Sequence, residues 1–325
     1  MPYLAELSNM GFRIGLTVWC SLLGVLAAYD QPAVYQLNAK DQIFVLGDST
    51  TADGLRVAGY VLLVDQALRE QLPDQGISVA GDGRPMKTAG SMVGPRGTVE
   101  GVVKPRMQKG PAPTVVIINF GLNDSKEGEK GIAQYTDNLR QAITQLREQK
   151  LTVLLCTPTT WGGLTQTKPY AEAARAIAVE LKCPLIDLYS VHADHITANT
   201  KDGKRLPGTN PTRDGTHMTI LGETLSATAI LQAFGLKPMW QNFQLRTAVA
   251  RRGKGKITVT PESPTYAPGT KVTLTVETEP GFTCFGWTNL TSDVVPAEKS
   301  PTLTVTMDRH QWYEADIRPE EAKKP

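Results

Sequence analysis

Apolar and polar positions alternate in two different ways along the chain, and the pattern changes near residue 240. From residue 42 to residue 234, short apolar runs alternate with longer amphipathic stretches, which is typical of βα units built around a parallel sheet. The predicted strands are residues 43–46, 77–79, 115–120, 151–155 and 185–188, and the predicted helices are residues 57–72, 132–149, 170–181 and 219–234. We therefore predict an α/β domain over residues 40–236, a three-layer α/β/α sandwich with a five-stranded parallel sheet.

Beyond residue 254 the apolar positions recur every second residue, as expected of half-buried strands in an antiparallel sheet. The segments with this period are residues 256–260, 271–276, 302–306 and 311–315. Pro-Gly pairs at 268–269 and 280–281 mark turns between them. We predict a linker over residues 237–253, a small antiparallel β domain over 254–317 and a disordered tail over 318–325.

The N-terminus carries an apolar run of its own, residues 14–28, which follows Arg13 and ends in Ala27 and Ala28. A membrane-spanning helix needs about 20 apolar residues, so this run fits the core of a secretory signal peptide better. Glu6 offsets Arg13, and an uncleaved signal anchor is therefore the alternative. In both cases we expect the protein to be secreted, periplasmic or attached to the cell surface, with residues 1–28 as the signal.

The composition of the chain indicates which kinds of partner and cofactor are expected. A formal net charge of +2, with 41% hydrophobic and 20% charged residues, is that of an ordinary globular protein and does not predict a nucleic-acid partner. Cys156 and Cys183 lie near the ends of neighbouring predicted strands, so a disulfide remains open, although buried free thiols are favoured. No residue spacing predicts a metal site or a cofactor.

Three polar motifs follow predicted strands or precede the last predicted helix. They are Gly47-Asp48-Ser49-Thr50 after the first strand, Gly121-Leu122-Asn123-Asp124 after the third, and Asp214-Gly215-Thr216-His217 before the helix at residue 219. Taken alone, the first two motifs are better explained as a turn or a helix cap, and the third could also be a helix cap. Their order along the chain, however, places all three at one edge of one sheet, where open α/β sheets bind ligands.

The chemistry of these residue types predicts a catalytic triad. A serine hydroxyl is a weak nucleophile that needs a neighbouring base, and His217 can supply one to Ser49. Asp214 lies three residues before His217 and can hold one imidazole nitrogen while the other stays free. We therefore predict that Ser49, Asp214 and His217 act as nucleophile, acid and base.

The three motifs in this order resemble the GDSL/SGNH hydrolase family, over residues 42–234. The resemblance implies a flavodoxin-like fold, serine esterase activity and no cofactor. It also implies an oxyanion hole formed by the backbone N–H of Ser49, the side-chain amide of Asn123 and the backbone N–H of a glycine after the second strand. We choose Gly83, which precedes an arginine, but Gly81 and Gly90 stay open because the asparagine that often precedes this glycine is missing.

The C-terminal stretch resembles the divergent InlB B-repeat family of bacterial surface proteins. The matching residues are 257–261, 266–270, 272–274, 280–282 and 285–287. The resemblance implies an exported bacterial protein in which this domain is a spacer or an adhesion unit, with a glycan or the cell surface as its contact. Because no catalytic motif lies there, we expect residues 256–317 to be dispensable for activity.

The function predicted from these observations is hydrolysis of O-acyl esters through an acyl-enzyme on Ser49. Acetyl esters of a carbohydrate, small or polymeric, are the favoured substrate, since Gly-Asp-Ser-Thr is similar to the block found in rhamnogalacturonan acetylesterases. Trp161, after the fourth predicted strand, is a candidate for the substrate pocket. The alternatives are a lipase, lysophospholipase or thioesterase on the same scaffold, or a non-catalytic adhesion or glycan-binding protein.

Overall fold

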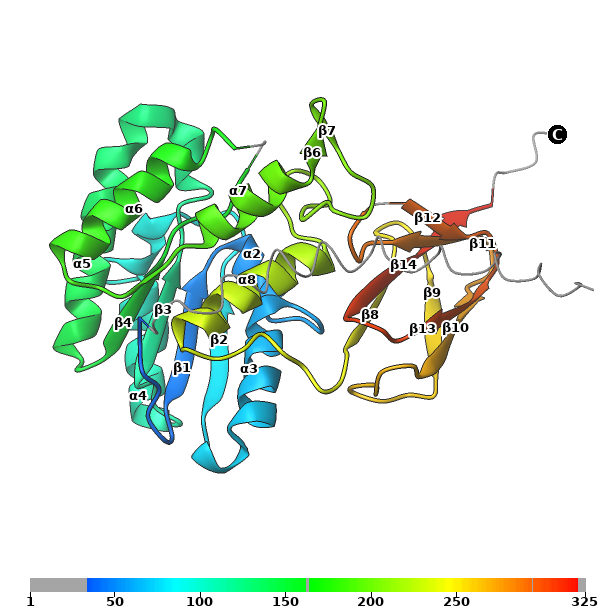
Figure 1. Ribbon diagram of the computed structural model, residues 1–325, viewed down its shortest axis with the longest axis horizontal. Coiled ribbons are helices and arrows are strands. Elements are labelled where there is room, and N and C mark those ends of the chain that lie inside the picture. The colour runs from blue at the N-terminus through cyan, green and yellow to red at the C-terminus, as the bar shows by residue number, and fades with distance from the viewer. Residues whose placement is uncertain (1–33, 162–163, 294, 321–325) are drawn as a thin grey trace, which may run out of the picture.

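The computed structural model describes residues 34–161, 164–293 and 295–320. The predicted signal segment, residues 1–28, and residues 321–325 of the predicted tail lie outside this range. An α/β domain and a β domain lie side by side (Figure 1). Within the described residues, no helix combines the length and the apolar character needed to cross a membrane.

The α/β domain is built on a five-stranded parallel sheet with the strand order β2-β1-β3-β4-β5. Its strands are β1 (Gln42–Gly47), β2 (Ser78–Gly83), β3 (Val115–Asn119), β4 (Thr152–Cys156) and β5 (Leu185–Ile186). This is the flavodoxin-like order, in which the chain turns back between β1 and β3. The sequence prediction of a five-stranded parallel sheet is confirmed.

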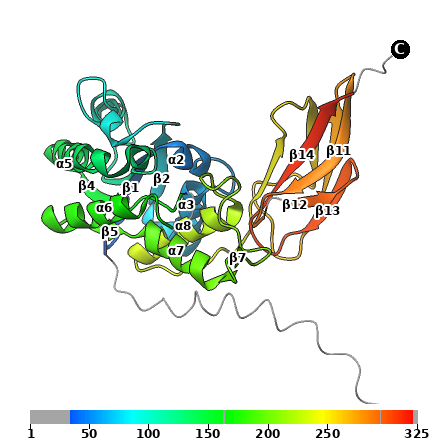
Figure 2. The ribbon, with the colours of Figure 1, turned by 90° about the horizontal axis from the view of Figure 1, so that it is seen from above.

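Helices cover both faces of this sheet, as Figure 2 shows from above. Successive side chains of a strand point to opposite faces, so Ile43 and Val45 pack with one helical layer while Phe44 and Leu46 pack with the other. The first layer contains α3 (Tyr60–Gln71) and α8 (Ile220–Ala233), and the second contains α5 (Ile132–Glu148) and α6 (Lys168–Glu180). Burial on both faces explains why the strands read as continuous apolar runs.

Shorter elements connect these layers. They are α2 (Ser49–Gly54), η1 (Pro73–Gln75), η2 (Ala89–Met92), η3 (Val99–Val103), α4 (Lys104–Lys109), η4 (Asp124–Gly131), α7 (Leu188–Ala198), and the hairpin of β6 (Thr200–Lys201) and β7 (Lys204–Arg205). The predicted strand at residues 185–188 is too long. The Asp187 carboxylate accepts a hydrogen bond from the Ser190 N–H and so begins α7 directly after Ile186.

The β domain packs two sheets over one apolar core. One sheet has the order β13-β10-β9 and the other β12-β11-β14-β8. The strands are β8 (Leu245–Val249), β9 (Gly255–Thr260), β10 (Lys271–Thr278), β11 (Phe282–Asn289), β12 (Val295–Glu298), β13 (Thr302–Thr306) and β14 (Gln311–Pro319). All pairings are antiparallel except that of β14 with β8.

Two predicted boundaries of the β domain are wrong. The predicted linker, residues 237–253, contains β8, which adds an edge strand to β14. The predicted disordered tail begins too early, because β14 continues to Pro319 and pairs there with Phe282. We therefore refer to residues 245–320 as the β-domain from here on.

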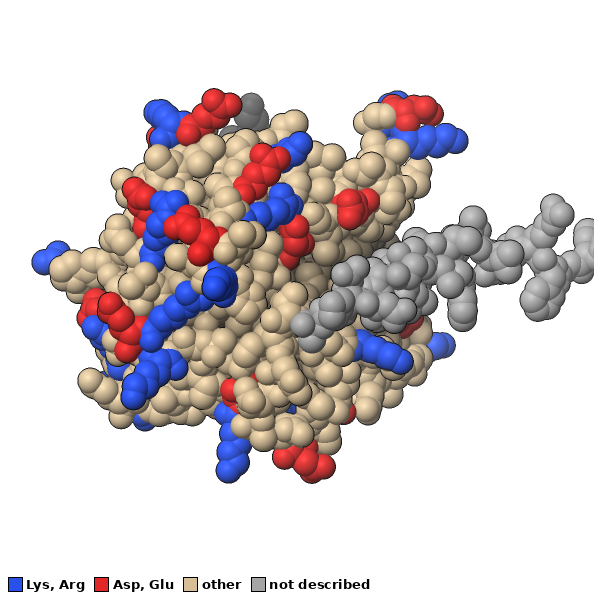
Figure 3. Space-filling view, turned by 60° about the vertical axis from the view of Figure 1, so that its left-hand side comes forward, with Lys and Arg blue, Asp and Glu red and all other residues tan. Residues whose placement is uncertain are grey.

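The surface carries charges of both signs. On the face shown in Figure 3, basic and acidic side chains are interspersed over the α/β domain. Ion pairs in the α/β domain join neighbouring turns or helices, such as Arg140 with Glu180 and Lys168 with Glu172. This mixture agrees with the small net charge of the whole chain.

Candidate active site

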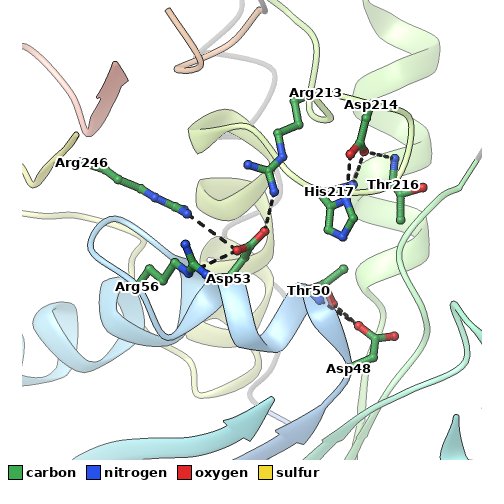
Figure 4. A network of polar contacts seen from close by, with 9 residues as sticks. All are labelled: Asp48, Thr50, Asp53, Arg56, Arg213, Asp214, Thr216, His217 and Arg246. Carbon is green, nitrogen blue, oxygen red and sulfur yellow. Dashed lines mark hydrogen bonds and ion pairs between the residues drawn. The ribbon is translucent and has the colours of Figure 1, made fainter. Parts of the chain in front are cut away.

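The carboxyl ends of β1 and β3 mark the point where the strand order reverses, and α2 begins there. Gly47 ends β1, Asp48 caps α2, and Ser49 is its first residue. The Asp48 carboxylate accepts hydrogen bonds from the backbone N–H and the hydroxyl of Thr50, both at 2.9 Å (Figure 4). The cap of this helix is therefore Asp48, and neither Ser49 nor Thr50 has that role.

Two glycines allow α2 to lie close to the sheet. A Cβ on Gly47 would overlap the Thr51 hydroxyl, and a Cβ on Gly83 would overlap the backbone N and Cα of Ala52. Gly47 and Gly83 are also paired in register at the ends of β1 and β2. These contacts set the position of the first turn of α2, and with it the position of Ser49.

Asp214 and His217 lie together on the loop that leads into α8. The Asp214 carboxylate accepts hydrogen bonds from Nδ1 of His217 at 2.8 Å and from the His217 backbone N–H at 2.7 Å. The Arg213 N–H donates to the His217 carbonyl at 2.8 Å and closes the turn. Figure 4 shows the imidazole extending from this loop toward the start of α2.

The environment keeps the Asp214 carboxyl ionised. Partial burial raises its pKa, but the hydrogen bonds from His217 and Thr216 outweigh burial and the net pKa is lowered. The carboxylate therefore fixes the tautomer with the proton on Nδ1 and leaves Nε2 to accept a proton. The His217 side chain is 31% exposed, so the imidazole is open to a substrate from solvent.

Within the part of the chain that the structure describes, the Ser49 hydroxyl has no hydrogen-bond partner. Among the side-chain hydrogen bonds between described residues, none involves Ser49 Oγ or His217 Nε2. Figure 4 shows the His217 imidazole extending toward Asp48 and Thr50, the residues on either side of Ser49. Burial raises the pKa of the Asp48 carboxyl. Catalytic hydrogen bonds are often long before a substrate binds.

Asn123 lies on the neighbouring loop after β3, with its amide held at both ends. Its Nδ2 donates to the Lys87 carbonyl at 3.0 Å, and its Oδ1 accepts from Lys126 Nζ at 2.9 Å. The next residue, Asp124, accepts from the Ala89 N–H at 3.1 Å. Burial is the main reason why the pKa of Asp124 is raised to about 6. These bonds join the loop after β3 to the loop after β2.

The three glycine candidates lie in different surroundings. Gly83 adjoins α2, whereas Gly81 lies two residues earlier in β2, next to Val45. Gly90 belongs to η2 and faces Asn138 of α5. Contact with α2 favours Gly83, and its role as an oxyanion donor stays a prediction.

Several residues near this site carry no sequence motif. Asp53, one turn after Ser49 on α2, accepts a hydrogen bond from Arg213 at 2.8 Å. Trp161 lies over the ammonium of Lys126, whose Nζ is 5.2 Å from the ring centroid. The sequence gives no sign of the contact between Asp53 and Arg213, because a lone carboxylate and a lone arginine, 160 residues apart, have no spacing that links them.

The two cysteines that could have formed a disulfide are free thiols. Cys156 and Cys183 are both buried, and the Cys183 thiol donates to the Val153 carbonyl at 3.0 Å. Among the described residues, no group of three or more His, Cys, Asp or Glu side chains has the geometry of a metal site.

The strand order, with α2 beginning at the switch point, defines a flavodoxin-like α/β fold, and the Asp214–His217 pair lies on the loop that faces this point. The model of the GDSL-like lipase/acylhydrolase family matches residues 45–223, more than half of the chain, and the chain belongs to this family. It is therefore a carboxylic ester hydrolase. The model of the divergent InlB B-repeat domain matches residues 245–315, which confirms the second resemblance and includes β8. No curated protein matches the sequence.

Solved structures with the same fold include esterases. The chain is 19% identical to an acetylxylan esterase, Axe2, from Geobacillus stearothermophilus, with a TM-score of 0.52, covering 63% of this chain and 99% of that one. It is 18% identical to LAE5, an alpha/beta hydrolase from the metagenome of Lake Arreo, Spain, with a TM-score of 0.51, covering 61% of this chain and 97% of that one. These likenesses show the fold of the α/β domain.

Proposed function

We propose that the protein hydrolyses O-acetyl esters of carbohydrates through an acyl-enzyme formed on Ser49. The observation that carries this proposal is the 2.8 Å hydrogen bond between Asp214 and Nδ1 of His217, on a loop that faces the start of α2. This hydrogen bond leaves Nε2 free to accept a proton, which the proposed reaction requires. Membership of an acylhydrolase family supplies the reaction class.

In the proposed mechanism, His217 takes the proton of Ser49 as the hydroxyl attacks the ester carbonyl. The imidazolium that forms is stabilised by the ionised Asp214. The oxyanion accepts hydrogen bonds from the Ser49 N–H, the Asn123 amide and the Gly83 N–H, as the family resemblance implies. The protonated imidazole then donates its proton to the departing alcohol. In the second half of the reaction a water molecule gives a proton to His217 and attacks the acyl-enzyme, and the imidazolium returns the proton to Ser49 as the carboxylic acid is released.

The test uses hydrolysis of p-nitrophenyl acetate by the wild-type protein and by Ser49→Ala. We expect turnover in the wild type and a loss of at least about 10³-fold in the variant, as found when a triad member is removed. Ser263→Ala, an exposed serine of the β-domain, is the matched control and should retain full activity. A fluorophosphonate reagent should transfer its phosphonyl group to Ser49 with loss of fluoride, and the mass of that group should appear on the peptide that contains Ser49.

Activity should also rise with pH, because a protonated His217 cannot accept the serine proton. An inactive wild-type protein, or a Ser49→Ala variant with unchanged turnover, would leave the adhesion or glycan-binding alternative as the function. A rate that is flat from acidic to alkaline pH would contradict the role of His217.

The choice of an acetylated carbohydrate rests on two observations. The Gly47-Asp48-Ser49-Thr50 block is similar to that of carbohydrate acetylesterases. A neighbour of the same fold is named an acetylxylan esterase. We expect release of acetate from acetylated xylan or pectin, and little activity on long-chain acyl esters. Preference for lysophospholipids or long-chain esters would favour the lipase-like alternative.

We also propose that the protein is exported. The apolar run of residues 14–28 and the B-repeat module support this location. N-terminal sequencing of protein recovered from the culture medium or periplasm of a bacterial host should start after Ala28. A protein that stays in the cytoplasm at full length would reject export.

A further inference from the structure

The loop that carries Asp214 and His217 is held from outside the α/β domain. We call residues 208–219 the acid–base loop. It contacts α2 on one side and the β-domain on the other, and Figure 4 shows the polar contacts around Asp53 at the centre. They lie away from the reacting atoms and involve residues that the proposed mechanism does not use.

The first set of contacts surrounds the carboxylate of Asp53. Arg213, the residue before Asp214, donates to Asp53 Oδ2 at 2.8 Å. Arg246 of β8 lies 3.7 Å from Asp53 Oδ1, and Arg56 lies 3.5 Å from the same atom. Because Asp53 is one helical turn after Ser49, this cluster links the helix of the nucleophile to the acid–base loop and to the β-domain.

The second set of contacts is an aromatic stack. The guanidinium of Arg246 lies 3.8 Å from the ring centroid of Trp312, and that of Arg213 lies 4.9 Å from it. Trp312, in β14, is only 2% exposed, and it packs with Ala58, Ile220 and Leu290. A cation over an indole face is most strongly attracted when it is desolvated. The Arg246 side chain is 7% exposed, which meets this condition.

The third set of contacts is formed by the backbone at both ends of the acid–base loop. Before the catalytic residues, the Asn210 N–H donates to the Ser292 carbonyl at 2.8 Å. After them, the N–H groups of Ile220 and Leu221 donate to the carbonyls of Leu290 and Thr291, at 3.2 and 2.8 Å. The first N–H groups of a helix have no partner within the helix, and carbonyl groups of the β-domain accept the hydrogen bonds of these N–H groups in α8.

From these three sets of contacts we infer that the β-domain is a positioning part of the active site, with Arg246 as its central residue. Arg246 and Trp312 hold Arg213 on Asp53, and the strand carbonyls hold the two ends of the acid–base loop. The orientation of Asp214 and His217 toward Ser49 thus depends on the β-domain. This inference rests on the proposed function, and it opposes the expectation that residues 256–317 are dispensable.

The physical basis is the sensitivity of a triad to distance. Reacting groups must be held close to their productive geometry, and a misplacement of about 1 Å can reduce the rate about 10²-fold. The acid–base loop is partly exposed, with Asp214 50% accessible, so its own packing within the α/β domain is limited. Contacts from a second domain supply the missing constraint.

The main experiment compares Arg246→Ala with Arg318→Ala in the full-length protein, using p-nitrophenyl acetate. Arg318 is the matched control, because it makes the same kinds of contact, an ion pair with Asp316 and a stack on Phe285 at 4.9 Å, within the β-domain alone. We expect Arg246→Ala to lower kcat at least about tenfold with KM within about twofold, and Arg318→Ala to keep the wild-type kcat.

Arg246→Lys is a second, more conservative variant, which tests the inference if Arg246→Ala does not fold. It keeps the charge and most of the stem but loses the planar stack on Trp312, so kcat should fall to a value between those of Arg246→Ala and the wild type. The inference is overturned if the folded Arg246 variants retain the kcat of Arg318→Ala. It is also overturned if only KM changes.

Amide hydrogen exchange gives a readout that needs no activity. Exchange in peptides covering residues 208–221 should be faster in Arg246→Ala than in the wild type and unchanged in Arg318→Ala. If the wild type does not hydrolyse esters but this exchange pattern is found, the proposed function fails while the positioning of the loop stands. Unchanged exchange in Arg246→Ala rejects the positioning itself.

Discussion

Three polar side chains near the candidate site each bind one atom of a neighbour and leave another atom available for catalysis. Asp48 takes the N-terminal cap of α2, so the Ser49 hydroxyl is not consumed by a capping bond. Asp214 occupies Nδ1 of His217 and leaves Nε2 open. At Asn123, Lys126 donates to the amide oxygen and one amide N–H donates to the Lys87 carbonyl, so the second N–H of the amide is the donor left for a substrate.

We therefore predict that substitutions at Asn123 and at Lys126 lower kcat to different degrees. Asn123→Ala should lower kcat by about 10² to 10³-fold, the usual cost of one oxyanion donor. Lys126→Met leaves the amide in place and removes only the bond that orients it, so we expect a smaller loss. Asn38→Ala, an exposed asparagine that donates to the Tyr35 hydroxyl, is the control and should be fully active. Equal rates for Asn123→Ala and wild type would remove Asn123 from the oxyanion hole.

At the scale of elements, the short helix α2 connects most parts of the site. It begins at Ser49, packs against β1 and β2 through Gly47 and Gly83, and carries Asp53 on its next turn. A buried network continues from it, since the Thr51 hydroxyl and the Asn119 amide both bond the hydroxyl of Tyr60. The helix has six residues, so its position depends on these tertiary contacts.

Gly83→Ala should therefore displace α2. The added methyl group meets backbone atoms of Ala52, which cannot rotate away, and overpacking of this kind costs about 1–3 kcal/mol. We expect a lower unfolding temperature together with a lower kcat. Gly101→Ala is the control, because its Cβ meets nothing within 4 Å. A Gly83→Ala variant as stable and as active as the control would contradict the close packing of α2.

At the scale of the whole molecule, the two domains share a buried polar junction. Gln244 of the segment before β8 donates to Gln66 of α3 at 2.7 Å, and Gln66 donates to the Asn242 carbonyl at 2.8 Å. Glu223 of α8 is fully buried beside this junction and accepts from the Tyr60 N–H at 2.9 Å. Such contacts bind the domains more closely than a flexible linker would.

Glu223 makes the stability of the molecule dependent on pH. Burial raises the pKa of its carboxyl to about 8, from an ordinary value of 4.5. The folded protein then holds a proton that the unfolded chain has released, so its free energy of unfolding falls as the pH rises from about 4.5 to about 8. This contribution is fully present below the lower value and lost above the higher one.

Glu223→Gln imitates the protonated carboxyl and should flatten this dependence. We expect the unfolding temperature of the wild type to decline between pH 6 and pH 8, and that of Glu223→Gln to decline less. Glu262→Gln, an exposed carboxylate of the β-domain, should behave as the wild type. Identical slopes for all three proteins would mean that Glu223 ionises normally in the folded state.

The hydrophobic pattern alone determined the class of both domains. Covered parallel strands appear as continuous apolar runs, and half-buried strands alternate, so the five-stranded sheet and four strands of the β-domain were predictable. The other strands were not. β11 has an irregular register next to Gly286, whose φ is 120°, and this interrupts the alternation. β8 is an edge strand that forms only by pairing with β14, which follows about 60 residues later.

For the site, the sequence determined the local turns and the candidates, and only the tertiary structure decided what surrounds them. Asp214 and His217 are three residues apart, so their hydrogen bond follows from a local turn. Asp53, Arg213 and Arg246 meet only because separate segments fold against one another. A single carboxylate and single arginines carry no local signal of their partners. The inferred dependence of the acid–base loop on the β-domain could therefore not be predicted from the sequence and follows only from the tertiary structure.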